Sequence, residues 1–236
     1  MNLDKFLISA SESVRRKGPN DRIVMSSRVR LARNIKDGAF PGWAKKPERV
    51  RVMEIIRPAV ESLPEMKGAF SETMDNITTL DKQILVERHL VSREHAAKSL
   101  GSGLVINTDE TLAVMINEED HLRMQALRPG LQIRQAWQAL DRLDSELERK
   151  LDYAFSNDLG YLTACPTNLG TGIRVSVLDG EGVEGFTRDG PVSCAMFAYG
   201  PESDEDDRVL EQRNVSGLVT EFLRLVQEMR EHGKAI

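Results

Sequence analysis

The sequence predicts an α+β fold, because helices and strands are mixed along the chain without regular alternation. Residues 131–155 carry one apolar stripe at helical spacing with charges on the opposite side, which predicts a long amphipathic helix. Residues 103–107 and 111–117 are short apolar runs around a Thr-Asp-Glu turn, which predicts a β-hairpin. A doubly wound parallel sheet is therefore disfavoured.

Further elements follow from the same patterns. Residues 47–63 carry apolar side chains every three or four positions, and a proline at their start suits the first turn of a helix. Residues 160–164 and 173–178 are predicted strands. Residues 179–208 are rich in Gly, Asp and Glu and favour loops around one short apolar run, and residues 215–229 predict a final helix.

Composition restricts the possible classes of protein. The chain has 236 residues, enough for one large domain or two small ones, with 40% hydrophobic and 29% charged residues, as in soluble globular proteins. A net charge of -5 disfavours nonspecific nucleic-acid binding. The 2 cysteines form neither a metal-binding spacing nor a disulfide framework, which favours a reducing, cytoplasmic setting. No apolar run approaches the roughly 18 residues of a membrane span.

The first cluster that carries chemistry is SSRVRLARN, residues 26–34. Arg28 and Arg30 are two residues apart, so an extended backbone places both on one face. Two guanidinium groups on one face can bind several oxygens of a polyphosphate. The alternative is a solvated basic strand. When this cluster is considered alone, the solvated strand is the favoured interpretation.

The second cluster is NEEDHLR, residues 117–123, directly after an apolar predicted strand. Three carboxylates, a histidine and an arginine lie at a strand end, where a sheet holds catalytic groups rigidly. A carboxylate here could orient or deprotonate a nitrogen nucleophile. A charged turn with a helix cap explains the cluster equally well.

The third cluster is CPTNLGTG, residues 165–172. Cys165 follows a predicted strand, Gly170 and Gly172 permit close approach of the backbone to a ligand, and Arg174 just beyond could reach a phosphate. The alternative is a buried structural cysteine beside a glycine-rich turn, which is the commoner role of a lone cysteine.

Together and in this order, the three clusters resemble the phosphagen kinases, the family of arginine and creatine kinases. The stretches KGPNDRIVMSSRVRLARN, LVERHLVS and DYAFSNDLGYLTACPTNLGTGIR are similar to those of bacterial protein-arginine kinases. The resemblance covers about residues 15–178. It implies the guanidino-kinase (glutamine-synthetase-like) catalytic fold, an antiparallel sheet flanked by helices, with residues 1–236 as a single catalytic domain.

The resemblance also implies roles for individual residues. Glu119 matches the catalytic carboxylate that orients the guanidinium and accepts its proton, and Cys165 takes the place beside the guanidinium, where nearby positive charge favours a thiolate. Mg²⁺ would bridge the phosphates of ATP, so no dense protein metal site is expected. The residues assigned to the nucleotide site are Ser27, Arg28, Val29, Arg30, Leu31, His89, Arg123, Arg174, Val175, Ser176, Val177 and Leu178.

The sequence departs from the family after Val177. LDGEGVEG follows at once, where the family continues into a further helix, a strand and a segment with another phosphate-binding arginine. Glu181 is then the candidate for the second catalytic carboxylate, and Arg188 is a substitute arginine that nothing in the spacing requires. Residues 179–236 are diverged, with no counterpart of the helical phosphoarginine-binding domain, so the catalytic fold is expected to be incomplete. This loss is expected to lower stability and charge compensation.

The function implied is ATP-dependent phosphorylation of arginine side chains in proteins. One alternative is a kinase of free arginine or another small guanidino compound, and another is a non-catalytic relic that binds nucleotide or a partner. The resemblance implies bacterial stress response and protein quality control. The partners are protein substrates with exposed arginines, a zinc-binding activator protein, a heat-shock repressor and a Clp protease. A homodimer is expected by the same analogy, and no membrane or direct nucleic-acid partner is expected.

Overall fold

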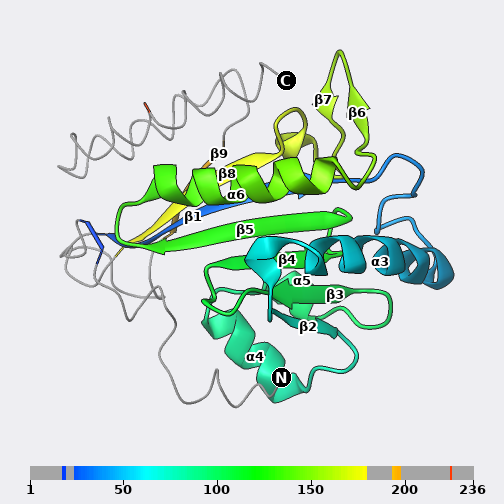
Figure 1. The fold of residues 1–236 in the computed structure, drawn as a ribbon, viewed down its shortest axis with the longest axis horizontal. Helices are drawn as coiled ribbons and strands as arrows, with labels where there is room; N and C mark the ends of the chain where they lie inside the picture. The colour runs from blue at the N-terminus through cyan, green and yellow to red at the C-terminus, as the bar shows by residue number, and fades with distance from the viewer. Residues whose placement is uncertain (1–17, 20–23, 180–192, 198–223, 225–236) are drawn as a thin grey trace.

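The computed structural model describes residues 18–19, 24–179, 193–197 and 224. Glu181 and Arg188 lie outside these residues. Almost all of the expected final helix, residues 215–229, also lies outside them. Within the described part, seven antiparallel strands form one sheet in the order β2-β3-β4-β5-β1-β8-β9 (Figure 1). Their bounds are β1 Val24–Arg33, β2 Phe70–Thr73, β3 Gly103–Ile106, β4 Leu112–Ile116, β5 Leu122–Pro129, β8 Ile173–Asp179 and β9 Ser193–Phe197. The predicted α+β class with an antiparallel sheet is confirmed.

Helices and a small hairpin complete the described part. The hairpin pairs β6 (Phe155–Ser156) with β7 (Gly160–Tyr161). The helices are α3 Lys46–Glu61, α4 Thr79–Glu87, α5 Arg93–Ala96 and α6 Ile133–Glu148, with single 3₁₀ turns at η1 Pro64–Met66 and η2 Pro166–Asn168. No helix among the described residues is long and apolar enough to cross a membrane.

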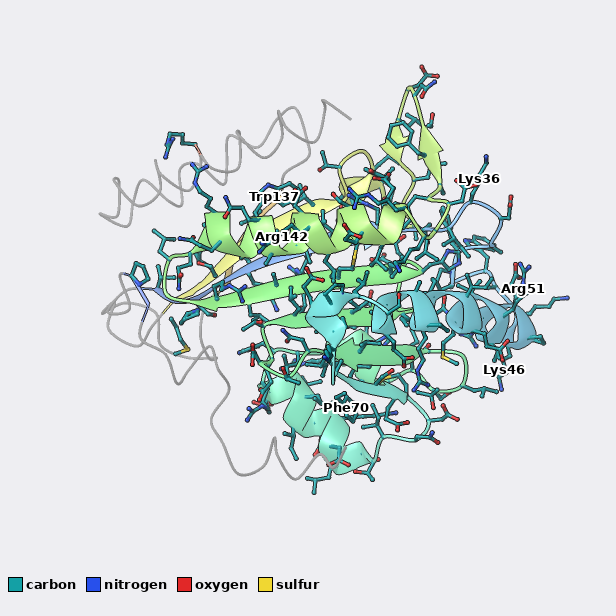
Figure 2. The ribbon with its side chains drawn as sticks, viewed as in Figure 1. Lys36, Lys46, Arg51, Phe70, Trp137 and Arg142 are labelled. Carbon is teal, nitrogen blue, oxygen red and sulfur yellow. The ribbon has the colours of Figure 1, made fainter. Side chains whose placement is uncertain are left out.

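One face of the sheet is covered by α3 and α6 (Figure 1). The apolar stripe of α6 buries Leu140, Leu143 and Leu147 completely against strands such as β1, from which Val29 and Leu31 point toward the helix. Side chains alternate between the two faces of a strand, so the residues next to Val29 and Leu31 point to the other face of the sheet. The opposite side of α6 carries Arg142, which is exposed (Figure 2).

The second face is divided into an apolar and a polar part. Over β2, β3 and β4, a second core forms between the sheet and the region of α4, with Phe70, Met74 and Leu85 almost fully buried (Figures 1 and 2). Along β5, β1 and β8 the same face carries polar side chains, including Arg28 and Arg30. This polar part of the sheet positions the site described below.

Most predicted elements are present, with different bounds. The hairpin of residues 103–117 is confirmed as β3 and β4, the helix of residues 47–63 as α3, and the strand of residues 173–178 as β8. The strand expected over residues 160–164 is wrong beyond Tyr161, where β7 ends. The apolar run in residues 192–199 contains β9. The strands β2 and β5 and the helices α4 and α5 were not predicted from the sequence.

The expected helix over residues 131–155 ends early, at Glu148. Beyond it, the backbone bonds to the segment after β1, because Lys36 N–H donates to the Asp152 carbonyl and Ala154 N–H to the Asn34 carbonyl. Leu151 still contributes to the core, but Phe155 belongs to β6 and is 48% exposed. Long-range backbone pairing therefore overrides the continuing apolar periodicity.

Candidate active site

Four arginines converge on the polar part of the sheet because three strands place them in register. Arg28 and Arg30 lie on one face of β1, as their spacing predicted. Arg30 lies opposite Arg174 of β8, and Arg123 of β5 lies opposite Ala32, one pair further along the same face. Side chains from sequence positions almost 150 residues apart are thereby brought together.

These arginines repel one another. Burial, followed by the charges of Arg123 and Arg174, lowers the pKa of Arg28, and burial together with its arginine neighbours lowers the pKa of Arg30 still further. Arg28 Nε donates to Ser176 Oγ at 3.3 Å, whereas Arg30 Nε is buried without a hydrogen-bond partner among the described residues. A polyanion bound here would relieve both the repulsion and the missing hydrogen bond.

The turn between β4 and β5 contains NEEDHLR and is held by its own side chains. Glu118 is buried and binds Arg123 Nη1 through both carboxylate oxygens, at 2.9 and 2.8 Å. It also accepts hydrogen bonds from Ser92 Oγ at 2.7 Å and from the Glu119 amide at 2.8 Å. Burial opposes ionisation, but Arg123 and these donors hold the pKa of Glu118 below its usual value. Glu118 is therefore a charged support for Arg123.

Asp120 connects three parts of the site. Its Oδ1 accepts a hydrogen bond from Asn34 Nδ2 at 2.6 Å and from the Ala164 amide at 2.7 Å, and the residue is 2% exposed. Asn34 Oδ1 in turn accepts from the His121 amide at 2.8 Å. The end of β1, the NEEDHLR turn and the segment before Cys165 are thus tied together by one buried network.

Glu119 is the member of this turn that remains accessible. Glu119 is exposed, and within the described part of the chain no hydrogen bond to its carboxylate is found. Burial of the carboxylate and the charges of Asp120 and Glu118 raise its pKa above the usual value. A raised pKa makes a carboxylate a better proton acceptor while it stays ionised near neutral pH.

Cys165 lies half-buried at the start of η2, and its Sγ is 3.0 Å from Thr167 Oγ1. Burial and the charge of Arg123 lower the pKa of Arg174, and Cys165 partly opposes this, so the thiol and Arg174 lie within electrostatic reach. The cysteine is therefore not a fully buried structural residue.

The glycines of this loop serve the fold of the chain itself. Gly172 has φ +66°, and a Cβ there would lie 2.5 Å from the Ala32 carbonyl oxygen. Gly170 has φ +103°, and a Cβ on its neighbour Gly160 would lie 2.7 Å from the Gly170 Cα. The backbone conformation and close contacts within the protein therefore favour glycine in this loop, and Gly172 also lines the cavity described below.

A cavity of about 790 Å³ joins the three clusters. Glu119 and Cys165 line it together with the three arginines Arg30, Arg123 and Arg174. Carboxylate, thiol and guanidinium groups thus face one volume, which suits a reaction between a cation and a polyanion.

Other residues assigned to the nucleotide site have different positions. Burial, followed by the charge of Arg28, lowers the pKa of His89, so Arg28 acts on His89 electrostatically. Ser176 lies on the arginine face. The Ser27 hydroxyl donates to the Gly130 carbonyl and accepts from the Gln132 amide. The side chains of Val29, Leu31, Val175 and Val177 belong to or pack against the core under α6, and Leu178 lies in β8.

Sequence reasoning missed several residues of the site. Glu118 and Asp120 stand within NEEDHLR, but nothing in their order separates a supporting carboxylate from an accessible one. Ser92 ends the stretch LVERHLVS but was given no role, and Trp43 lies outside every motif. Trp43 lines the cavity although 89% of it is exposed.

Fold and site together define a guanidino phosphotransferase type of catalytic domain. The sequence model of the ATP:guanido phosphotransferase C-terminal catalytic domain matches residues 51–179, which is more than half of the chain. The chain therefore belongs to the ATP:guanido phosphotransferase family, and the expected resemblance is confirmed.

Named relatives make the relationship more specific. The protein-arginine kinase of Halothermothrix orenii is 46% identical over 162 residues, covering 69% of this chain and 46% of that protein. The protein-arginine kinase of Symbiobacterium thermophilum is 42% identical over 178 residues, 73% of this chain and 50% of that protein. This chain thus spans about half the length of these relatives. The duplicated taurocyamine kinase of Schistosoma mansoni, with bound transition-state analogue components, matches in fold with a TM-score of 0.65 and 24% identity, over 72% of this chain and 26% of that one.

Proposed function

We propose that this chain transfers the γ-phosphoryl group of ATP to arginine side chains in proteins. The observation that supports this proposal best is the single cavity that joins Glu119 and Cys165 to Arg30, Arg123 and Arg174. The first two groups suit a guanidinium, and the three arginines suit a triphosphate.

The arginine face would bind the phosphates of ATP. Arg28, Arg30, Arg123 and Arg174 offer forked donors from three adjacent strands, and Glu118 holds Arg123 in place. Mg²⁺ would be held mainly by the phosphate oxygens, whose charge it reduces. Among the described residues, no group of three or more His, Cys, Asp or Glu side chains is placed to hold a metal ion.

Glu119 would act on the substrate guanidinium as orienting group and proton acceptor. As a guanidinium nitrogen forms its bond to the γ-phosphorus, the bond from that phosphorus to the bridging oxygen of ADP breaks and ADP leaves. The nitrogen loses a proton, which the Glu119 carboxylate accepts. Cys165 would lie beside the same guanidinium, and Glu181 is proposed as a second carboxylate. Catalysis then depends mainly on alignment and charge neutralisation.

Between protein-borne and free arginine, we favour protein-borne arginine as the substrate, because the relatives with 46% and 42% identity are named protein-arginine kinases. We propose a cytoplasmic enzyme of protein quality control and stress response. Its partners would be protein substrates with exposed arginines, a zinc-binding activator, a heat-shock repressor and a Clp protease, and it would form a homodimer. A kinase of free arginine is the second candidate, because the same cavity would accept either form of guanidinium.

Phosphorus NMR with the purified chain and Mg-ATP tests this proposal. Three parallel samples contain an arginine-rich protein, free arginine or no acceptor. ADP and a phosphoramidate signal that stays with the protein fraction are expected in the first sample. A signal only with free arginine would replace the proposal with the small-substrate reaction. No transfer in any sample, with ATP still bound, would favour a nucleotide-binding relic.

A further inference from the structure

Trp43 occupies an unusual place for a large apolar side chain. It is 89% exposed, more than any other large hydrophobic residue described, and it lines the cavity that contains Glu119. Isolated exposed apolar residues are ordinary on protein surfaces. An exposed indole on the wall of a cavity is different, because it offers apolar surface to a ligand bound there.

The segment that carries Trp43 is fixed to the turn that carries Glu119. The His121 ring donates from Nε2 to the Ala39 carbonyl at 3.0 Å, and the Phe40 ring meets the His121 ring edge-on with centroids 6.3 Å apart. The Trp43 amide donates to the Phe40 carbonyl at 2.8 Å. The backbone that carries Trp43 is therefore fixed relative to the turn that carries Glu119, so the indole stays beside the cavity.

The chemistry of the cavity indicates what this indole contacts. Glu119, the accessible carboxylate of the NEEDHLR turn, lines the same cavity and attracts a cation. An exposed indole offers a large apolar face and one N–H donor, which suits contact with a polypeptide backbone and with aliphatic side chains. Free arginine brings little apolar surface, whereas an arginine in a polypeptide brings neighbouring backbone and side chains that would cover the indole.

We propose that Trp43 is a specificity-determining residue that packs against the polypeptide segment carrying the substrate arginine. It favours protein-borne arginine over free arginine. This inference rests on the proposed function, whose substrate class it makes more specific.

Tryptophan fluorescence provides a direct test, because the chain contains only 2 tryptophans. Trp137 packs partly buried against the core on α6, so Trp137→Phe leaves Trp43 as the only indole (Figure 2). An unstructured peptide with one arginine is expected to shift the emission to shorter wavelength. The same peptide with glutamine in place of arginine, and free arginine, are expected to leave it unchanged. An equal shift with free arginine, or no shift while calorimetry detects peptide binding, would overturn the inference.

A second variant tests the contact without changing Trp137. Trp43→Ala is expected to weaken peptide binding about tenfold in calorimetry and to change free-arginine binding by less than about twofold. Leu80→Ala, on a residue of α4 that is 64% exposed and does not line the cavity, is the matched control and is expected to change neither. Unchanged peptide affinity in Trp43→Ala, or no peptide binding by the parent chain, would overturn the inference. Loss of phosphoryl transfer with the Trp43 shift retained would count against the proposed function alone.

Discussion

Replacing Arg30 by methionine should stabilise the chain without ligand and weaken its binding of ATP. Methionine keeps the aliphatic stem but removes a half-buried charge beside Arg28, Arg123 and Arg174. It also removes a buried Nε without a partner among the described residues. An unsatisfied buried donor costs about 1–3 kcal/mol, so the free energy of unfolding should rise by a similar amount. For a chain of this size that is roughly 2–4 °C in Tm per kcal/mol.

The same substitution should reduce nucleotide affinity. Loss of one charge-assisted hydrogen bond to a phosphate costs about 1.5–3 kcal/mol. The Kd for ATP should therefore rise roughly 10- to 150-fold. Opposite signs in stability and binding are the signature of a residue kept for its ligand rather than for the fold.

Urea unfolding without ligand and calorimetry with ATP measure the two effects. Arg142→Met, on the exposed side of α6, is the matched control and should change each by less than about 0.5 kcal/mol (Figure 2). A clear loss of stability in Arg30→Met without ATP, or unchanged ATP affinity, would refute the assignment of Arg30 to a phosphate site.

Further predictions concern catalysis, nucleotide binding and the fold. Glu119→Gln should nearly abolish transfer and leave the Kd for ATP close to that of the parent; equal loss of both would contradict its role as base. Arg123→Ala should raise the Kd for ATP at least about tenfold, and a normal affinity would remove this residue from the phosphate site. Asp144→Ala should lower the free energy of unfolding by about 3–5 kcal/mol, since it leaves the buried Arg33, now 2.6 Å from Asp144, without its partner; a urea midpoint near that of the parent would contradict this. Burial lowers the pKa of His95 to about 4 in the folded chain, from 6.5 unfolded, so its contribution to stability is present above pH 6.5 and is lost toward pH 4. Between pH 7 and pH 4, the free energy of unfolding measured in urea should fall by roughly 3 kcal/mol more in the parent than in His95→Gln. Equal decreases in the two proteins would contradict the lowered pKa of His95.

Local sequence patterns predicted the parts of the fold that depend on short-range physics. The alternation of Arg28 and Arg30 with apolar residues placed both arginines on one face of a strand, and β1 has this arrangement. The hairpin of β3 and β4 followed from two apolar runs around a turn. In these cases the side-chain period alone decides which face is buried.

Long-range contacts account for what the sequence did not predict. The end of α6 depends on backbone bonds to residues near Asn34, more than 100 positions away. The bond from the Ala164 amide to Asp120 likewise joins segments 44 residues apart. β5 was missed because its charged beginning, at the end of NEEDHLR, hides a short alternation in which Leu122, Met124 and Ala126 are the apolar members.

The site shows the same division. The three motifs supplied its accessible groups, including Glu119 and Cys165, and the cavity joins them. The supporting bond from Glu118 to Arg123 and the exposed position of Trp43 depend on how distant segments meet, which no spacing along the chain encodes.

Phosphoarginine formation is the most direct test of the central claim. The purified chain is incubated with Mg-ATP and an arginine-rich protein, and the products are analysed by mass spectrometry without acid, because the P–N bond is acid-labile. Glu119→Gln is treated in parallel. The account predicts phosphoarginine on the protein with the parent chain and almost none with the variant. No phosphoarginine with the parent chain, while ATP is bound, would contradict it.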